Sequence, residues 1–174
     1  MDTSLEEDFL DRETKSHHPL VEKVPLTGDE LQSSVPYSVG FFRRVSLAHG
    51  LHEEMGISSV RSKFQHTKDA QKSLSIEIMD GAGELGALLI EKSEEKLKED
   101  FEDHSLPEKT VINEHQTFRV LEKERTDLHR TYLEFIHSKR FLIKVHTQNL
   151  SKEELIDFIH LFRLEKEVID TSSQ

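Results

Sequence analysis

The stretch 140–162 constrains the fold most, because a strand, a turn and a helix follow one another there and each has a local chemical cause. Phe141, Ile143 and Val145 alternate with their neighbours, as in a strand that buries one face. A preceding strand at 131–136 is expected to pair with it as a hairpin. Only an odd-length loop places the apolar residues of both strands on one face, so we predict an odd-length loop.

A helix is predicted directly after this hairpin. Leu155, Ile159 and Phe162 recur at helical spacing. Ser151 and Glu154 form the S-x-x-E pattern of a capping box, which marks the helix start. This C-terminal helix is expected to pack on the apolar face of the hairpin. That face consists of Leu133, Phe135, Phe141, Ile143 and Val145.

Further strands and one long helix are predicted upstream. The strand candidates are 41–47, 60–64, 74–78, 110–113 and 117–121. Apolar residues at helical spacing predict a helix from Glu84 to Phe101, the long central helix of the domain. The expected fold class is therefore α+β: a mostly antiparallel sheet of five to seven strands, with a long central helix and a C-terminal helix packed on the sheet.

The chain has the length of one domain with flanking tails. Its 174 residues suffice for one proper core and are too few for two ordinary domains. Residues 1–22 combine low hydrophobicity with high charge, so we predict an acidic, disordered tail there. A single α+β domain is expected over 23–165, followed by a disordered C-terminus over 166–174.

The predicted tail contains one amphipathic pattern. Leu5, Phe9 and Leu10 lie on one side of a short helix, and Ser4 with Glu7 forms another capping-box pattern at its start. These three apolar residues are candidate partner-binding residues, because such a peptide could dock on another protein. A frayed terminus is the alternative.

Charge and composition exclude several classes of partner. The net charge is −11, from 34 acidic and 23 basic residues, so the mean field repels phosphate backbones. The sequence shows no basic patch beyond Arg43-Arg44, and we expect no nucleic-acid partner. The N-terminus lacks the basic start and apolar run of a signal peptide, and no stretch approaches the roughly 20 apolar residues of a membrane span. A cytoplasmic location without a membrane span is therefore expected.

One glycine motif is typical of a phosphate site. Gly81, Gly83 and Gly86 form G-x-G-x-x-G between a predicted strand and a predicted helix, where helix amides can hold a pyrophosphate. Two carboxylates, Asp80 and Glu84, lie beside that site, and no parallel strand with a terminal acid follows. The leading interpretation is that these glycines only make the tight turn between strand and helix. In an alternative interpretation, they form a cofactor-binding site.

No catalytic or metal-ligating set emerges. The chain contains 11 histidines, but the spacing of His49, His52 and their acidic neighbours matches no zinc signature. It contains no cysteine, which excludes disulfides and thiolate chemistry, and no nucleophile elbow. We therefore name no catalytic residue, no metal ligand and no cofactor.

Four short motifs resemble those of a known group. They are Gly40-Phe41 with Arg43, Ile76-Glu77-Ile78-Met79-Asp80-Gly81, Arg140-Phe141-x-Ile143-x-Val145, and Ser151-Lys152-Glu153-Glu154-Leu155. Together, over about residues 24–164, they resemble a loose group of uncharacterised bacterial α/β-sandwich proteins of the PsbP-like kind. The resemblance implies a mostly antiparallel sheet carrying helices. Many of those proteins are associated with the cell envelope, whereas this chain shows no export signal.

These observations favour a noncatalytic binding or interaction protein that engages a protein partner. Whether it is an enzyme stays open, although the missing catalytic signatures favour a protein that is not one. The alternative is a small-molecule or nucleotide-binding domain that uses the turn from Gly81 to Gly86. An exposed sheet edge can also pair with a second copy, so a homodimer stays open.

Overall fold

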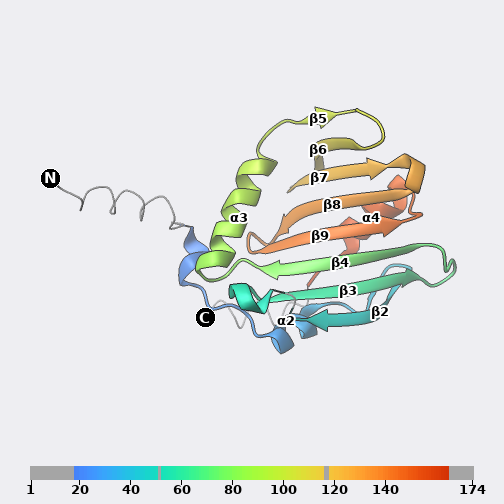
Figure 1. Ribbon diagram of the computed structural model, residues 1–174. Coiled ribbons are helices and arrows are strands. Elements are labelled where there is room, and N and C mark those ends of the chain that lie inside the picture. The colour runs from blue at the N-terminus through green and yellow to red at the C-terminus, as the bar shows by residue number, and fades with distance from the viewer. Residues whose placement is uncertain (1–17, 51, 116–117, 165–174) are drawn as a thin grey trace.

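The computed structural model describes residues 18–50, 52–115 and 118–164. Nine strands form one antiparallel sheet in the order β1-β2-β3-β4-β9-β8-β7-β6-β5 (Figure 1). The strands are β1 (Ser38–Val39), β2 (Phe42–His49), β3 (Ser59–His66), β4 (Ser73–Asp80), β5 (Glu102–Asp103), β6 (Lys109–His115), β7 (Phe118–Arg125), β8 (Arg130–His137) and β9 (Phe141–Gln148). The sheet thus consists of two meanders, which meet where β4 pairs with β9.

Helices lie on both faces of this sheet. In Figure 1, α3 (Glu84–Leu97) stands in front of the strands and α4 (Lys152–Leu161) lies behind them, on the face that α2 (Gly28–Ser34) also covers. The 3-10 helices are η1 (Pro19–Glu22), η2 (Glu53–Met55) and η3 (Thr126–Leu128). Within the described ranges, no helix has the length and apolar character that crossing a membrane requires.

The predicted number of strands was wrong. The sheet has nine strands instead of five to seven, because the two-residue strands β1 and β5 form its edges. Backbone pairing defines these strands, with Val39 opposite Phe42 and Glu102 opposite Val111. Two residues are too few to show an alternating pattern, so the sequence carries no signal for them.

The predicted long central helix was also wrong. Helix α3 ends at Leu97, although the apolar spacing continues to Phe101. Phe101 is exposed, and its carbonyl oxygen accepts a hydrogen bond from the amide of Ile112 at 2.9 Å. The chain therefore leaves the helix to pair as β5, and α3 lies across the strand ends at one side of the sheet (Figure 1).

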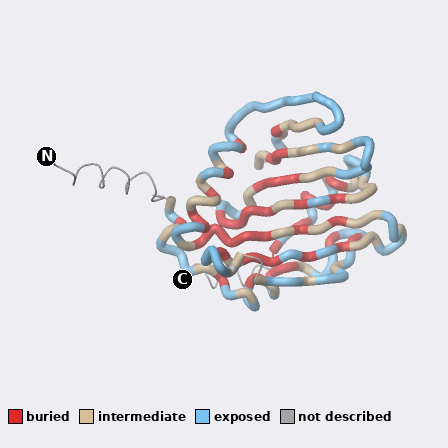
Figure 2. The backbone as a smooth tube through the Cα atoms, in the orientation of Figure 1, coloured by how far each residue is buried: buried red, intermediate tan, exposed pale blue. Residues whose placement is uncertain are grey.

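The main core fills the space between the sheet and the helices α2 and α4. Buried residues run along the central strands (Figure 2). The loop 138–140 of the β8–β9 hairpin has the predicted odd length. Leu133 accordingly lies opposite Val145 and Phe135 opposite Ile143, which confirms the predicted common face.

Helix α4 closes this core. Its predicted capping box is confirmed: the amide of Glu154 donates to Ser151 Oγ at 3.1 Å, and the amide of Ser151 donates to Glu154 Oε2 at 2.8 Å. The ring of Phe158 lies edge-on to Phe42 at 5.8 Å and to Phe64 at 6.0 Å between centroids. The apolar stripe of α4 and the five apolar residues of the hairpin belong to one cluster.

A smaller core lies under α3. Ala87 and Ile90 pack with Met79, Leu142 and the buried Leu20 of η1. Helix η1 falls within the stretch 1–22 that was predicted as a tail, whereas residues 1–17 lie outside the described residues. Since α3 reaches only one side of the sheet, none of the helices in the described ranges lies over the rest of this face.

Candidate functional site

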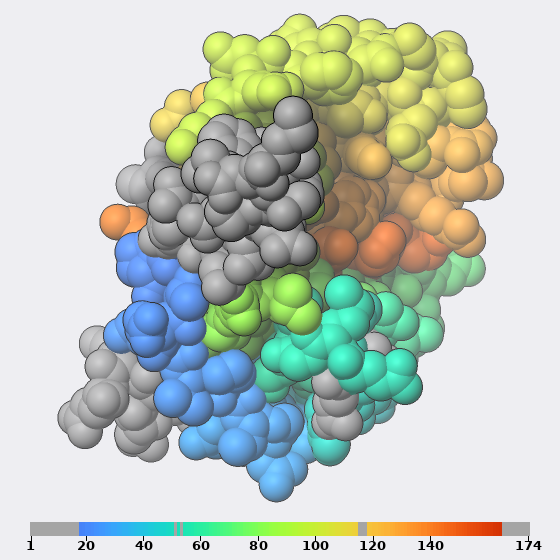
Figure 3. Space-filling view, turned by 60° about the vertical axis from the view of Figure 1, so that its left-hand side comes forward, coloured from blue at the N-terminus to red at the C-terminus, as the bar shows by residue number. Residues whose placement is uncertain are grey.

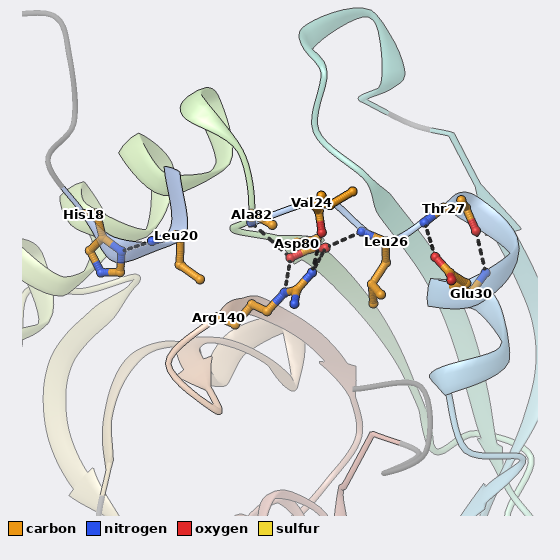
Figure 4. Close-up of polar contacts among 9 residues, drawn as sticks. All are labelled: His18, Leu20, Val24, Leu26, Thr27, Glu30, Asp80, Ala82 and Arg140. Carbon is orange, nitrogen blue, oxygen red and sulfur yellow. Dashed lines mark hydrogen bonds and ion pairs between the residues drawn. The ribbon is translucent and has the colours of Figure 1, made fainter. Parts of the chain in front are cut away.

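A buried ion pair lies beneath the glycine motif. Arg140 Nε donates to Asp80 Oδ1 at 2.7 Å, and Arg140 Nη2 donates to Oδ2 at 2.8 Å (Figure 4). The same carboxylate accepts the amide protons of Leu26 and Ala82. Arg140 also donates to the carbonyl oxygen of Val24 at 3.1 Å. The carboxylate of Asp80 thus lies beside the glycine turn and is satisfied by Arg140 and by two backbone amides.

The three glycines of the motif permit close packing. A Cβ on Gly86 would lie 2.7 Å from the carbonyl carbon of Gly81. A Cβ on Gly81 would lie 2.5 Å from the carbonyl oxygen of Arg140. Gly83 has φ 85° and ψ 175°, a conformation that is essentially confined to glycine. Its amide donates to the carbonyl oxygen of Leu20 at 3.0 Å, so η1 packs against the start of α3. These contacts explain the motif without a ligand.

The other candidates that the structure describes do not gather into a site. Leu5, Phe9 and Leu10 lie outside the described residues. His52 Nε2 contacts Glu77 Oε1 at 3.0 Å. Across the described ranges, no group of three or more His, Asp or Glu side chains is arranged to hold a metal ion.

A further candidate is the part of the α3 face that α3 does not reach and that no other described helix covers. Strand pairing places its side chains in rows across five strands, β3, β4, β9, β8 and β7. We call this surface the basic face. The first row is Arg61, Glu77, Lys144 and Glu134; the second is Lys63, Ser75, His146, Tyr132 and Lys123; the third is Gln65, Ser73, Gln148, Arg130 and Arg125.

Basic side chains outnumber acidic ones on the basic face. The bases are Arg61, Lys63, Lys123, Arg125, Arg130 and Lys144, and the acids are Glu77 and Glu134. Near its edge, Asp127 of η3 binds Arg125 at 2.8 Å. The surface therefore carries a local positive charge on a chain of net charge −11.

Both acidic side chains in the rows of the basic face are largely buried, and each is paired with a basic side chain. The Glu77 side chain is 13% exposed, whereas its partner Arg61, 2.6 Å away, is 54% exposed. Burial alone would raise the pKa of Glu77, but the hydrogen bonds from Arg61 and His52 outweigh it and hold this pKa below its ordinary value. The negative charge is thus neutralised within the sheet, while the guanidinium projects into solvent.

Glu134 follows the same pattern. Its side chain is 7% exposed and contacts Lys96 Nζ of α3 at 2.9 Å. Tyr132 donates its hydroxyl proton to Glu134 at 2.6 Å. Burial would raise the pKa of Glu134, but the hydrogen bonds from Tyr132 and Lys96 outweigh it and lower this pKa. Burial and the bond to Glu134 in turn raise the pKa of Tyr132, which stays protonated.

An aromatic pair marks the middle of the basic face. The ring centroids of Tyr132 and His146 lie 4.8 Å apart. Lys123 Nζ lies 5.9 Å from the centroid of Tyr132 on the other side. His146 is exposed, yet partial burial of its ring and the nearby charge of Arg61 lower its pKa. At neutral pH the pair therefore offers uncharged ring surface among cations.

The basic face is concave beside this pair. A cavity of 430 Å³ is lined by Tyr132 and His146 together with the bases Lys123, Arg125 and Arg130 and one acid, Glu108. In Figure 3, the orange and red strands β8 and β9 lie recessed between the yellow segment above them and the turquoise and green segments below. A partner segment therefore has a trough to follow across the strands.

Sequence reasoning missed the basic face. It searched for consecutive basic residues and found Arg43-Arg44. The bases of this surface are separated along the chain and come together only through strand pairing, for example Arg61 beside Glu77 and Lys144. The available signal was alternation: Arg61 and Lys63 occupy the outward positions of a predicted strand.

Comparison of the chain with protein-family models, with curated proteins and with solved structures gives no match. The resemblance to the PsbP-like group, the cytoplasmic location and the homodimer therefore stay predictions. The functional argument rests on the geometry of the chain itself.

Proposed function

We propose that the chain is a noncatalytic binding protein that engages a protein partner through its basic face. The partner contributes an acidic segment, which lies across the three rows of side chains. The observation that carries this proposal is the reversal of charge: a surface dominated by lysine and arginine on a chain whose net charge is −11. Complementary charge steers association and fixes orientation.

The arrangement of the charges indicates that the exposed basic residues serve partner binding and are not needed for the stability of the fold. Glu77 and Glu134 are already neutralised by neighbouring cations, so additional basic residues are not needed to satisfy them. Lys63 is exposed and lies opposite the uncharged Ser75. Exposed cations of this kind add little to folding stability, but they remain available to carboxylates of a partner.

A protein segment fits better than a nucleic acid. The acidic remainder of the chain repels a long phosphate backbone, whose charge extends far beyond the basic face. A short acidic segment meets only the local positive charge, because screening limits the interaction to about 10 Å at 0.1 M salt. The ring pair of Tyr132 and His146 also offers contact to apolar parts of such a segment.

The test is direct binding of a defined acidic probe. Fluorescently labelled decaglutamate is titrated with the full chain at low salt, and anisotropy reports binding. The double variant Lys63→Glu/Lys144→Glu should bind about tenfold more weakly or worse, equivalent to about 1.4 kcal/mol or more. The control Lys139→Glu/Lys152→Glu makes the same charge change at exposed lysines outside the basic face and should retain binding.

Two outcomes contradict the proposal. Equal losses in both double variants would mean that only net charge matters. Binding of a labelled duplex DNA without binding of decaglutamate would assign the surface to nucleic acid instead.

A further inference from the structure

A second surface feature lies at the end of the sheet where β1 turns into β2. A cleft of 510 Å³ opens between this turn and the C-terminal half of α4. Its apolar walls include Phe42 and Phe158 deep inside, and Phe41 and Leu161 at the mouth. Both mouth residues are 59% exposed. A folded chain gains nothing by leaving two such side chains in water beside an open apolar cleft.

Local backbone geometry creates this cleft. Gly40 has φ +55°, and a Cβ at this position would lie 3.2 Å from Leu161 Cδ1. The turn between β1 and β2 therefore passes close to α4 without a side chain between them. His66 stacks on Phe41 at 5.7 Å between centroids and lies edge-on to Phe42 at 5.2 Å, which holds the ring of Phe41 beside the opening.

The charges around the mouth are of opposite sign on its two sides. On the strand side, Lys68 Nζ lies 4.9 Å from the ring centroid of Phe41. On the helix side, α4 contributes Glu154 and the exposed Asp157. Glu154 is bound by Lys72 at 2.5 Å. An occupant with an acidic end and a basic end therefore has one favoured orientation, with its acidic end toward Lys68.

The cleft is continuous with the basic face. A neighbouring hollow of 430 Å³ shares His66 and Lys68 with the cleft and is also lined by Arg43, Gln65 and Asp69. Gln65 belongs to the third row of the basic face, and Arg43 pairs with it across β2 and β3. The acidic end of an occupant near Lys68 thus points toward the surface that we assign to an acidic segment.

We infer that the cleft receives a large apolar side chain of a protein partner whose adjoining acidic residues run over Lys68 onto the basic face. This inference rests on the proposed function, because it assigns the two surfaces to one partner segment. The cleft supplies a buried anchor, and the basic face supplies charge complementarity. A cleft of 510 Å³ lies within the range of about 300–1,000 Å³ that is usual for binding pockets.

The absence of tryptophan from the chain allows a specific test. The probe is a synthetic peptide with one tryptophan between a run of glutamates and a run of lysines. When this tryptophan enters the cleft, its fluorescence emission should shift to shorter wavelength and saturate with the concentration of the full chain. A peptide with lysines on both sides should bind about tenfold more weakly, because it presents no carboxylate to Lys68.

Single substitutions test whether the tryptophan binds in the cleft. Phe41→Ala and Leu161→Ala should each weaken binding of the tryptophan peptide about fivefold or more, because both side chains form the mouth. Leu85→Ala removes an exposed apolar side chain of α3, outside both the cleft and the basic face, and should leave the affinity unchanged. No blue shift, or the same affinity in Phe41→Ala and Leu161→Ala as in the unchanged chain, would overturn the inference.

Its failure can be distinguished from failure of the proposed function. Phe41→Ala should still bind decaglutamate normally, since that probe contains no apolar anchor. If decaglutamate binds the basic face and the tryptophan peptide shows no cleft-dependent shift, the proposed function stands and the cleft assignment falls. If the tryptophan peptide binds in the cleft and decaglutamate does not bind, the proposal of an acidic partner segment is wrong. The assignment of both surfaces to one partner segment is then wrong as well.

Discussion

Arg140 and Asp80 form a buried bidentate ion pair that joins three distant parts of the chain. Their nitrogen–oxygen distances are 2.7 and 2.8 Å, and Asp80 is fully buried. Through the bonds to Leu26 and Ala82, the pair connects the N-terminal segment, the turn before α3 and the β8–β9 hairpin. The pair thus ties the turn that leads into α3 to the rest of the sheet.

Arg140→Met should lower the free energy of unfolding by about 3–5 kcal/mol. The substitution leaves the carboxylate of Asp80 buried without its cation, which costs more than the pair itself contributes. Urea denaturation followed by circular dichroism measures the change. Arg125→Met breaks the exposed pair with Asp127 and should leave the free energy of unfolding nearly unchanged, because solvent screens that pair. Similar losses in both variants would contradict a special role for the buried pair.

Gly83→Ala should destabilise the chain by about 1–3 kcal/mol, because alanine does not readily adopt φ 85° and ψ 175°. Thermal denaturation measures the loss. Nucleotides and dinucleotides should not raise the melting temperature of the unchanged chain, because close packing accounts for Gly81 and Gly86 and the amide of Gly83 is already bound to the carbonyl oxygen of Leu20. A reproducible nucleotide-induced shift that Gly83→Ala abolishes would support a ligand role for the glycines instead.

Phe158→Ala should cost about 3–5 kcal/mol, since it removes a buried aromatic side chain that contacts Phe42 and Phe64. Phe41→Ala is the matched control: its ring is 59% exposed, so the loss should be smaller by several fold. Chemical denaturation of both variants provides the comparison. Equal losses would contradict the packing of α4 on the sheet.

Stability should fall as the pH decreases from 7 to 5. Burial, with a contribution from the charge of Arg163, lowers the pKa of His137. The unfolded chain therefore takes up a proton more readily than the folded chain once the pH falls through about 6.5, and protonation favours unfolding. The pKa values of Glu77 and Glu134 are also lowered, but their protonation reduces the free energy of unfolding only below about pH 4.5. His137→Gln should reduce the fall, as measured by urea denaturation at each pH; an unchanged slope would refute this assignment.

The sequence predicted those parts of the fold whose causes are local. Ser151 and Glu154 define the start of α4 because capping involves neighbouring backbone amides. The common face of Leu133 and Phe135 follows from the parity of the hairpin loop. The edge strands β1 and β5 were missed because they exist only through pairing with β2 and β6.

The candidate site was missed for a related reason. Arg61 and Lys63 lie on β3 and Lys144 lies on β9, and each is an ordinary outward residue in its own segment. Their proximity depends on the pairing of β4 with β9, which joins the two meanders. A search along the chain sees runs of charge, whereas this charge is organised across strands.

The most direct test of the central claim is to map where an acidic segment binds on the intact chain. Decaglutamate is added at low salt to the isotopically labelled full chain, and amide chemical shifts are followed by NMR. The account predicts that the largest changes cluster on the basic face, around Lys63, Tyr132, Lys144 and His146, and disappear at high salt. Changes that cluster elsewhere, or no change at low salt, would contradict it.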